Sequence, residues 1–160
     1  LRKNTDLSEE LVQLLSSYGM GSVRINMANS VEIMQTVQNT AIKWLTSFNS
    51  ESLEELLHTS EAWSKSKNEE WRFLLDFLET WFRDLTWLRF GLPENKILNQ
   101  YCNSNVDRVR DLKQCGKHFS LHQIFEIFRE IEESRKAINL NANKSLAIGS
   151  LCLQIFRTAT

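Results

Sequence analysis

Residues 69–90 read EEWRFLLDFLETWFRDLTWLRF, and this stretch decides the fold. One apolar stripe recurs along it at helical spacing and comprises Trp71, Leu74, Leu75, Leu78, Trp81, Phe82, Leu85 and Leu88. A second stripe, on another face, comprises Phe73, Phe77 and Trp87. A helix that is apolar on two faces must be covered on two sides. The segment is therefore predicted to be the central helix of the domain, ended by Gly91 and Pro93.

Weaker amphipathic patterns flank this central segment in the sequence. Apolar residues at helical spacing predict helices that begin near Asn29 or Ser30, at Ser52, near Val106, at Ser120 and at Asn143. Asn68 is the expected cap of the central helix, and a further short helix is expected over 96–101. No segment alternates as a strand would. The sequence therefore predicts an all-α fold, a compact bundle of about six helices.

The last two predicted helices meet at a sharp corner. Residues 134–155 read SRKAINLNANKSLAIGSLCLQI, with Asn141 and Asn143 between two apolar helical segments. Asparagine tolerates the left-handed backbone conformation that often ends a helix, and it also caps helix N-termini well. We expect Asn141 and Asn143 to set the angle at which the last helix leaves the corner.

Composition and charge exclude several classes of protein. The chain has 160 residues, of which 42% are hydrophobic, and only five are Gly and one is Pro. This suits one all-helical globular domain. The net charge of −1 argues against a nucleic-acid or membrane surface, although Arg108, Arg110, Lys113 and Lys117 leave nucleic-acid binding as an alternative. Because the chain opens on Leu1, we expect it to be part of a longer protein.

The cysteines and histidines offer one candidate metal site. Cys102, Cys115, His118 and His122 form a C-x12-C-x2-H-x3-H pattern of zinc-ligand types, but a zinc finger needs a close first pair of cysteines. Half-buried cysteines and surface histidines are the favoured interpretation, and a small metal-binding helical domain stays open as an alternative. Three cysteines without framework spacing, and no targeting or long apolar segment, favour a reducing cytoplasm.

No catalytic signature accompanies these residues. The chain has no phosphate-binding glycine loop and no serine in a nucleophile-elbow pattern. Cys115 and His118 could form an activated thiol, but such a spacing is common by chance. We therefore expect no enzyme activity, cofactor or small-molecule substrate for this chain.

Two features of the central helix suggest contacts rather than chemistry. Arg83 and Asp84 lie between apolar positions, so at least one of these charges is expected to be partly buried and paired. Trp87, on the second apolar face, is the best candidate for contact with another domain or subunit.

Three blocks of sequence resemble one known family in their order and spacing. They are LLDFLETWFRDLTWLRFG at 74–91, the corner segment at 134–155 and, more weakly, GMGSVRINMA at 19–28. Together they resemble the C-terminal part of the bacterial DNA polymerase III delta-prime subunit, a clamp-loader component. The first block is similar to that family's apolar helix with Arg-Asp-Leu, and the second to its Asn-x-Asn corner and last helix.

The resemblance implies a domain organisation and a role. Residues 1–28 would be the tail of the AAA+ lid domain, and 29–160 the helical collar, which assembles with the gamma/tau and delta collars. The subunit would support sliding-clamp loading in DNA replication, meeting DNA only through the complex and using no ATP itself. Val23 would then stand where active relatives place an ATP-sensing arginine, with Arg24 one position away. A gamma/tau or delta collar remains the alternative within the same complex.

Overall fold

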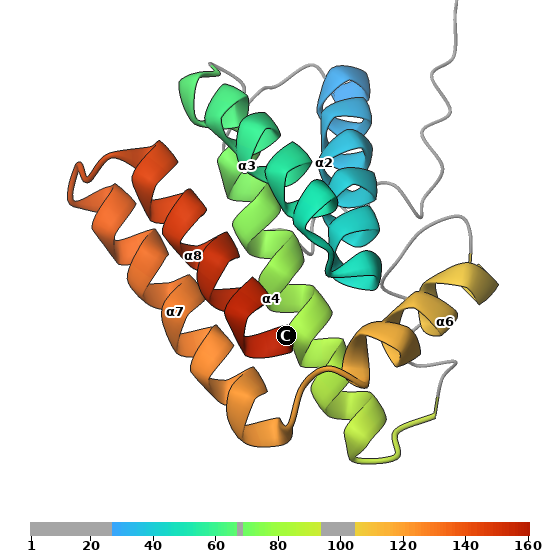
Figure 1. Ribbon diagram of the computed structural model, residues 1–160. Helices are drawn as coiled ribbons and strands as arrows, with labels where there is room; N and C mark the ends of the chain where they lie inside the picture. Colours follow the sequence, from blue (N-terminus) through green and yellow to red (C-terminus); the bar gives the residue numbers. More distant parts are fainter. Residues whose placement is uncertain (1–26, 67–68, 94–104) are drawn as a thin grey trace, which may run out of the picture.

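The structure is a computed structural model that describes residues 27–66, 69–93 and 105–160. Within these ranges it contains six helices and no strand (Figure 1). The helices are α2 (Met27–Ser47), α3 (Ser50–Lys65), α4 (Glu70–Arg89), α6 (Asn105–Gly116), α7 (Leu121–Asn139) and α8 (Lys144–Ala159). The predicted all-α bundle is confirmed. Residues 1–26 of the expected lid tail at 1–28 lie outside the described residues, as do Cys102 and the expected helix over 96–101.

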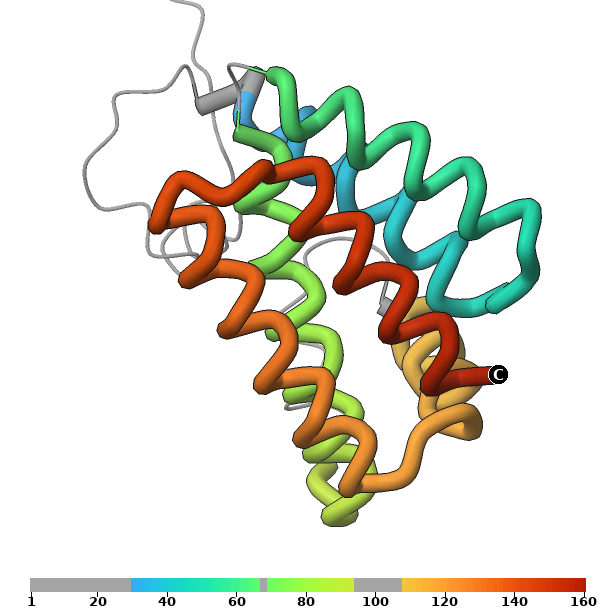
Figure 2. The backbone as a smooth tube through the Cα atoms, turned by 60° about the vertical axis from the view of Figure 1, so that its left-hand side comes forward, coloured from blue at the N-terminus to red at the C-terminus, as the bar shows by residue number. Residues whose placement is uncertain are grey.

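Helix α4 runs through the middle of the bundle and packs against α2, α3, α6 and α7 (Figure 1). Helix α8 packs against α3 and α7, as the second view also shows (Figure 2). Both apolar stripes of α4 contribute to the core. Trp81 of the first stripe and Phe77 of the second have no exposed surface, whereas Trp87 is only partly buried. The prediction of a central helix covered on two sides is confirmed.

An aromatic chain connects α4 to the elements around it. The ring of Phe119, between α6 and α7, lies edge-on to Phe82 of α4 and to Phe48 after α2, with centroid distances of 5.3 and 5.5 Å. The indole N–H of Trp81 donates to the Cys115 thiol of α6 at 3.3 Å. Edge-on aromatic pairs add specific geometry to the burial of large apolar surfaces. These contacts hold the ends of α2 and α6 against the lower half of α4.

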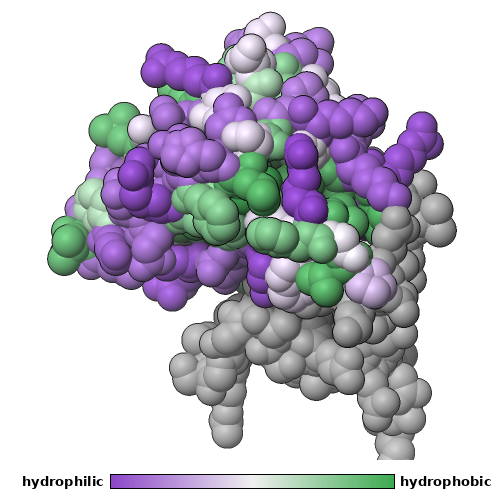
Figure 3. Space-filling model, turned by 90° about the horizontal axis from the view of Figure 1, so that it is seen from below, coloured by the Kyte–Doolittle hydropathy of each residue, from purple (hydrophilic) through white to green (hydrophobic). Residues whose placement is uncertain are grey.

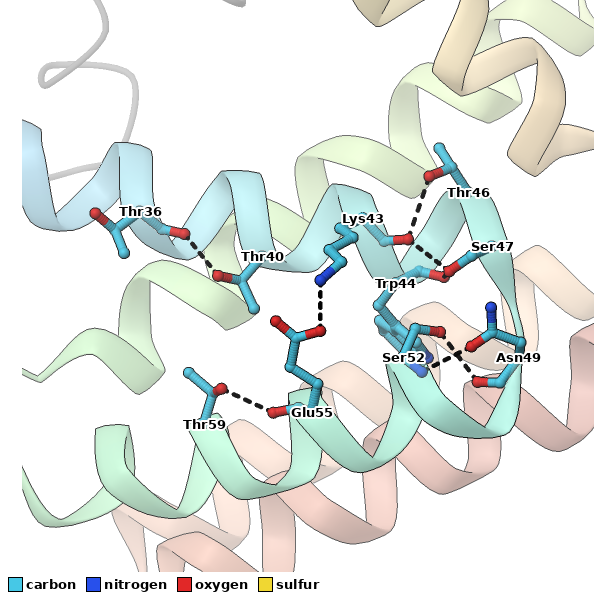
Figure 4. A network of polar contacts seen from close by, with 10 residues as sticks. All are labelled: Thr36, Thr40, Lys43, Trp44, Thr46, Ser47, Asn49, Ser52, Glu55 and Thr59. Carbon is cyan, nitrogen blue, oxygen red and sulfur yellow. Dashed lines mark hydrogen bonds and ion pairs between the residues drawn. The ribbon is translucent and has the colours of Figure 1, made fainter.

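Helices α2 and α3 form a hairpin that turns at Phe48 and Asn49 (Figure 4). Phe48 adopts a positive φ of 41°, and the Asn49 side chain accepts from the Ser52 backbone N–H at 2.7 Å, which caps α3. Lys43 and Glu55 bridge the helices at 2.6 Å, but both are well exposed and contribute little. Helix α2 begins at Met27, so the expected cap at Asn29 or Ser30 is wrong, since both lie inside the first turns.

The two ends of α4 differ in how far the sequence predicts them. At the N-terminal end the cap is Glu69, in the left-handed conformation and without a side-chain hydrogen bond, and the expected cap, Asn68, lies outside the described residues. At the C-terminal end Gly91 has φ 75°, and its N–H donates to the Leu88 carbonyl at 3.1 Å. The Leu92 N–H donates to the Trp87 carbonyl at 3.1 Å, and the two hydrogen bonds together form a Schellman motif, which ends the helix.

The corner between α7 and α8 has the predicted chemistry. Asn141 has φ 65°, and its N–H donates to the Ile138 carbonyl at 3.0 Å. The Asn143 side chain accepts from the Leu146 N–H at 3.1 Å and caps α8. Ser120 caps α7 as predicted, in a reciprocal arrangement with Gln123. One asparagine therefore ends α7 and the other begins α8.

An ion-pair fork fixes α7 against α4. The Arg135 guanidinium contacts Asp76 at 2.7 Å and Glu79 at 2.9 Å, and three quarters of the arginine side chain is covered. A guanidinium shared between two carboxylates has a defined geometry, because its donors lie in one plane. No helix in the described part of the chain is both long and apolar enough to cross a membrane.

The corner makes a stability prediction. Replacing Asn143 by Ala removes the α8 cap and should lower the free energy of unfolding by about 1 kcal/mol in urea denaturation. Replacing Asn141 by Ala should lower it by about 1 kcal/mol through left-handed strain, whereas Asn141→Gly, the matched control, should change it little. Wild-type stability in both alanine variants would contradict this role.

Candidate interaction surfaces

The exposed face of α8 carries leucines where a surface helix usually carries charge. Leu146, Ser150, Leu153 and Arg157 follow one another at spacings of four, three and four residues, and all are exposed. We call these four residues the α8 stripe. Leu146 is 73% and Leu153 is 38% exposed, while the opposite face of α8 is buried in the core. Because α8 also contains no acidic residue, its outer face suits contact with another protein.

The corner adds a further exposed leucine. Leu140, the C-cap that follows α7, is 81% exposed and stands directly before Asn141. The two asparagines therefore hold a tight turn that presents Leu140 on one side and Leu146 on the other. This gives the predicted residues Asn141 and Asn143 a positioning role, since they fix where these leucines stand.

A second apolar surface lies at the C-terminal end of α4. Phe90 is 67% exposed, Leu92 is exposed at the following turn, and Trp87 is half-buried beside them. We call these three residues the α4 end. The α4 end and the beginning of α7, which carries the exposed Phe125, both lie at the bottom of the bundle (Figure 1). Seen from below, apolar side chains form a broken band between polar ones on the described residues (Figure 3).

Arg83 and Asp84 connect the core of α4 to this surface. Asp84 is fully buried, whereas the Arg83 side chain is 43% exposed, and Nε lies 3.4 Å from Oδ1. The Arg83 guanidinium also lies over the Trp87 ring, 5.0 Å from its centroid. A buried carboxylate requires a compensating partner, so Arg83 is held in place and in turn orients Trp87. The expectation that one charge of this pair is buried is confirmed, and contact of Trp87 with another subunit stays a prediction.

The cysteine and histidine candidates are dispersed. Cys115 is buried, and burial raises the pKa of its thiol to about 12, against a smaller opposing effect of the Trp81 N–H. His118 packs on Phe48 with its Nδ1 3.3 Å from the Ala159 carbonyl, and His122 is exposed beside Glu126. Across 27–66, 69–93 and 105–160, no three His, Cys, Asp or Glu residues gather so as to hold a metal. Cys102 lies outside the described residues.

The basic residues of α6 are divided between structure and surface. Arg108 donates to the Asn39 side chain of α2 at 3.0 Å, so it helps to hold the two helices together. Arg110 is exposed. Lys113 and Lys117 line a groove between α6 and the end of α4, which is described below.

No family model, curated protein or solved structure matches the chain. The residues themselves therefore carry the functional argument. Of the apolar residues of the last helix, Ile148, Leu151 and Ile155 are buried, whereas Leu146 lies on the exposed face. The signal that could have revealed the α8 stripe was the spacing of Leu146 and Leu153 outside the face of Ile148, Leu151 and Ile155, in a helix without carboxylates.

The buried thiols predict an alkaline loss of stability. Burial raises the pKa of both Cys115 and Cys152 from 9.0 to about 12. The stability that the buried neutral thiols contribute is complete below pH 9.0 and is lost as the pH rises towards 12, because the thiols of the unfolded chain ionise first. Near pH 10 each thiol should lower the free energy of unfolding by about 1 kcal/mol. In denaturation series measured below and above pH 9.0, the free energy of unfolding of Cys152→Ala should decline less with pH than that of the unmodified chain. Parallel curves for the two proteins would refute this.

Proposed function

We propose that this chain is an assembly domain, the helical collar of a bacterial clamp-loader subunit of the delta-prime type. In this role it joins the gamma/tau and delta collars in a ring that loads sliding clamps during DNA replication. The resemblance of 74–91 and 134–155 supports the family. The six-helix bundle is compatible with a collar, and Arg83-Asp84 and the Asn141 to Asn143 corner lie at organising positions in it.

The observation that carries the proposal is the presence of two separate apolar surfaces on one small bundle. A subunit inside a ring of different neighbours needs two different contact surfaces, because each side meets another partner. The α8 stripe and the α4 end belong to different helices, and both expose large apolar side chains. Isolated exposed leucines are ordinary on protein surfaces, but residues repeated along one helix face are typical of interaction sites.

The rival interpretations have less support. A gamma/tau or delta collar would use the same architecture, and the Arg-Asp-Leu and Asn-x-Asn blocks favour delta-prime. A Cys/His metal domain would need several ligands close together, and the described residues bring no three His, Cys, Asp or Glu side chains into one such group. We therefore propose no catalysis and no direct DNA contact for this chain.

The two surfaces should act independently in assembly. Leu146→Glu with Leu153→Glu places charge on the α8 stripe, and Phe90→Glu places it on the α4 end. When each variant is mixed with gamma/tau and delta collars, light scattering should show that it still forms a complex with one collar and no longer forms one with the other. The affinity for the lost neighbour should fall at least about tenfold, because a carboxylate is desolvated without a partner.

Thr36→Glu on the exposed face of α2 is the matched control and should assemble normally. Absence of any complex between the unmodified chain and both collars would overturn the proposal. So would loss of assembly in the Thr36 variant but in neither surface variant.

A further inference from the structure

A groove lies between the C-terminal end of α4 and helix α6, apart from the α8 stripe. Its volume is about 620 Å³, within the range of roughly 300–1,000 Å³ that ligand sites occupy. Leu85, Leu88, Leu92 and Leu112 supply its apolar lining. The remaining described lining residues are glycines and cations.

The two walls of the groove are held together by Arg89. Its Nη2 donates to the Gly116 carbonyl at 2.5 Å and to the Phe119 carbonyl at 2.7 Å, so the end of α4 is bound to the end of α6. Gly116 allows this approach, since a Cβ there would come within 3.1 Å of the Leu85 side chain. The groove is therefore formed before anything binds, which lowers the entropy lost on binding.

The charge of the groove is one-sided. Arg89, Lys113 and Lys117 line it, and none of the described lining residues is acidic. Arg89 donates to two neutral backbone carbonyls, and neither Arg89 nor Lys117 forms an ion pair with a carboxylate in the described ranges. A guanidinium has five N–H donors, so Arg89 keeps donors for another acceptor. An apolar floor beside the positive charges of Arg89 and Lys117 favours an occupant that is both apolar and anionic.

We propose that this groove binds a short segment of a partner protein in which leucine or phenylalanine stands next to aspartate or glutamate. The apolar side chain would lie on the leucine lining, and the carboxylates would meet Lys117 and Arg89 at the rim. Charge-assisted hydrogen bonds would fix the direction of the segment, while burial of its apolar side chain supplies most of the affinity. This goes beyond assembly of the collar, because the segment would enter the groove between α4 and α6, which shares only Leu92 with the α4 end.

A synthetic peptide that repeats Glu-Leu-Phe-Asp is the probe, labelled for fluorescence anisotropy. Its control repeats Gln-Leu-Phe-Asn, which keeps the apolar side chains and removes the charge. The acidic peptide should bind the chain at least about tenfold more tightly than the control, and its affinity should fall as salt is added. Failure of the acidic peptide to bind, or equal binding of both peptides, would overturn the proposal.

Two pairs of variants locate the binding. Lys117→Glu and Leu92→Glu should each weaken the acidic peptide at least about tenfold, because both place a carboxylate at the groove. Lys65→Glu on α3 and Thr36→Glu on the exposed face of α2 lie outside the groove lining and should bind like the unmodified chain. Thermal unfolding confirms that each variant is folded. Unchanged binding in both groove variants would refute the site, and binding of decanoate without binding of the peptide would refute a protein partner.

Discussion

The burial of α4 on two faces is the constraint on which the rest of the structure depends. Each large apolar side chain that α4 buries contributes roughly 1.5–3 kcal/mol, and the helix buries them towards opposite sides. Neither a single helical hairpin nor a single layer could cover both faces. The chain therefore places α2, α3 and α6 on part of this surface and α7 on another, while α8 closes the bundle against α3 and α7. The aromatic contacts of Phe82 and Phe119 then fix how the ends of these helices meet.

The exposed surfaces follow from the same constraint. Helix α8 packs one face against α3 and α7, so its other face stays exposed. That exposed face carries Leu146 and Leu153. At the end of α4 the Phe90 side chain is exposed, while the neighbouring Arg89 binds the end of α6. One end of the central helix thus supplies both an apolar surface and a wall of the cationic groove.

The sequence predicts the parts of this fold whose signals are local. The double stripe of α4, the glycine stop at Gly91 and the caps at Ser120 and Asn143 were all readable, because each depends on residues within a turn or two. The left-handed conformation of Glu69, which caps α4, was not, since no side-chain cap signals it. The groove beside Arg89 depends on which helices pack together, which spacing alone does not determine.

The central claim is that the α8 stripe and the α4 end join this bundle to neighbouring helical domains. Hydrogen–deuterium exchange tests it most directly, comparing the chain alone with the chain mixed with gamma/tau and delta collars. The account predicts added protection in α8 and at the end of α4, with α2 and α3 unchanged, because contact slows local opening only where it occurs. Protection confined to α2 and α3, or no added protection anywhere, would contradict it.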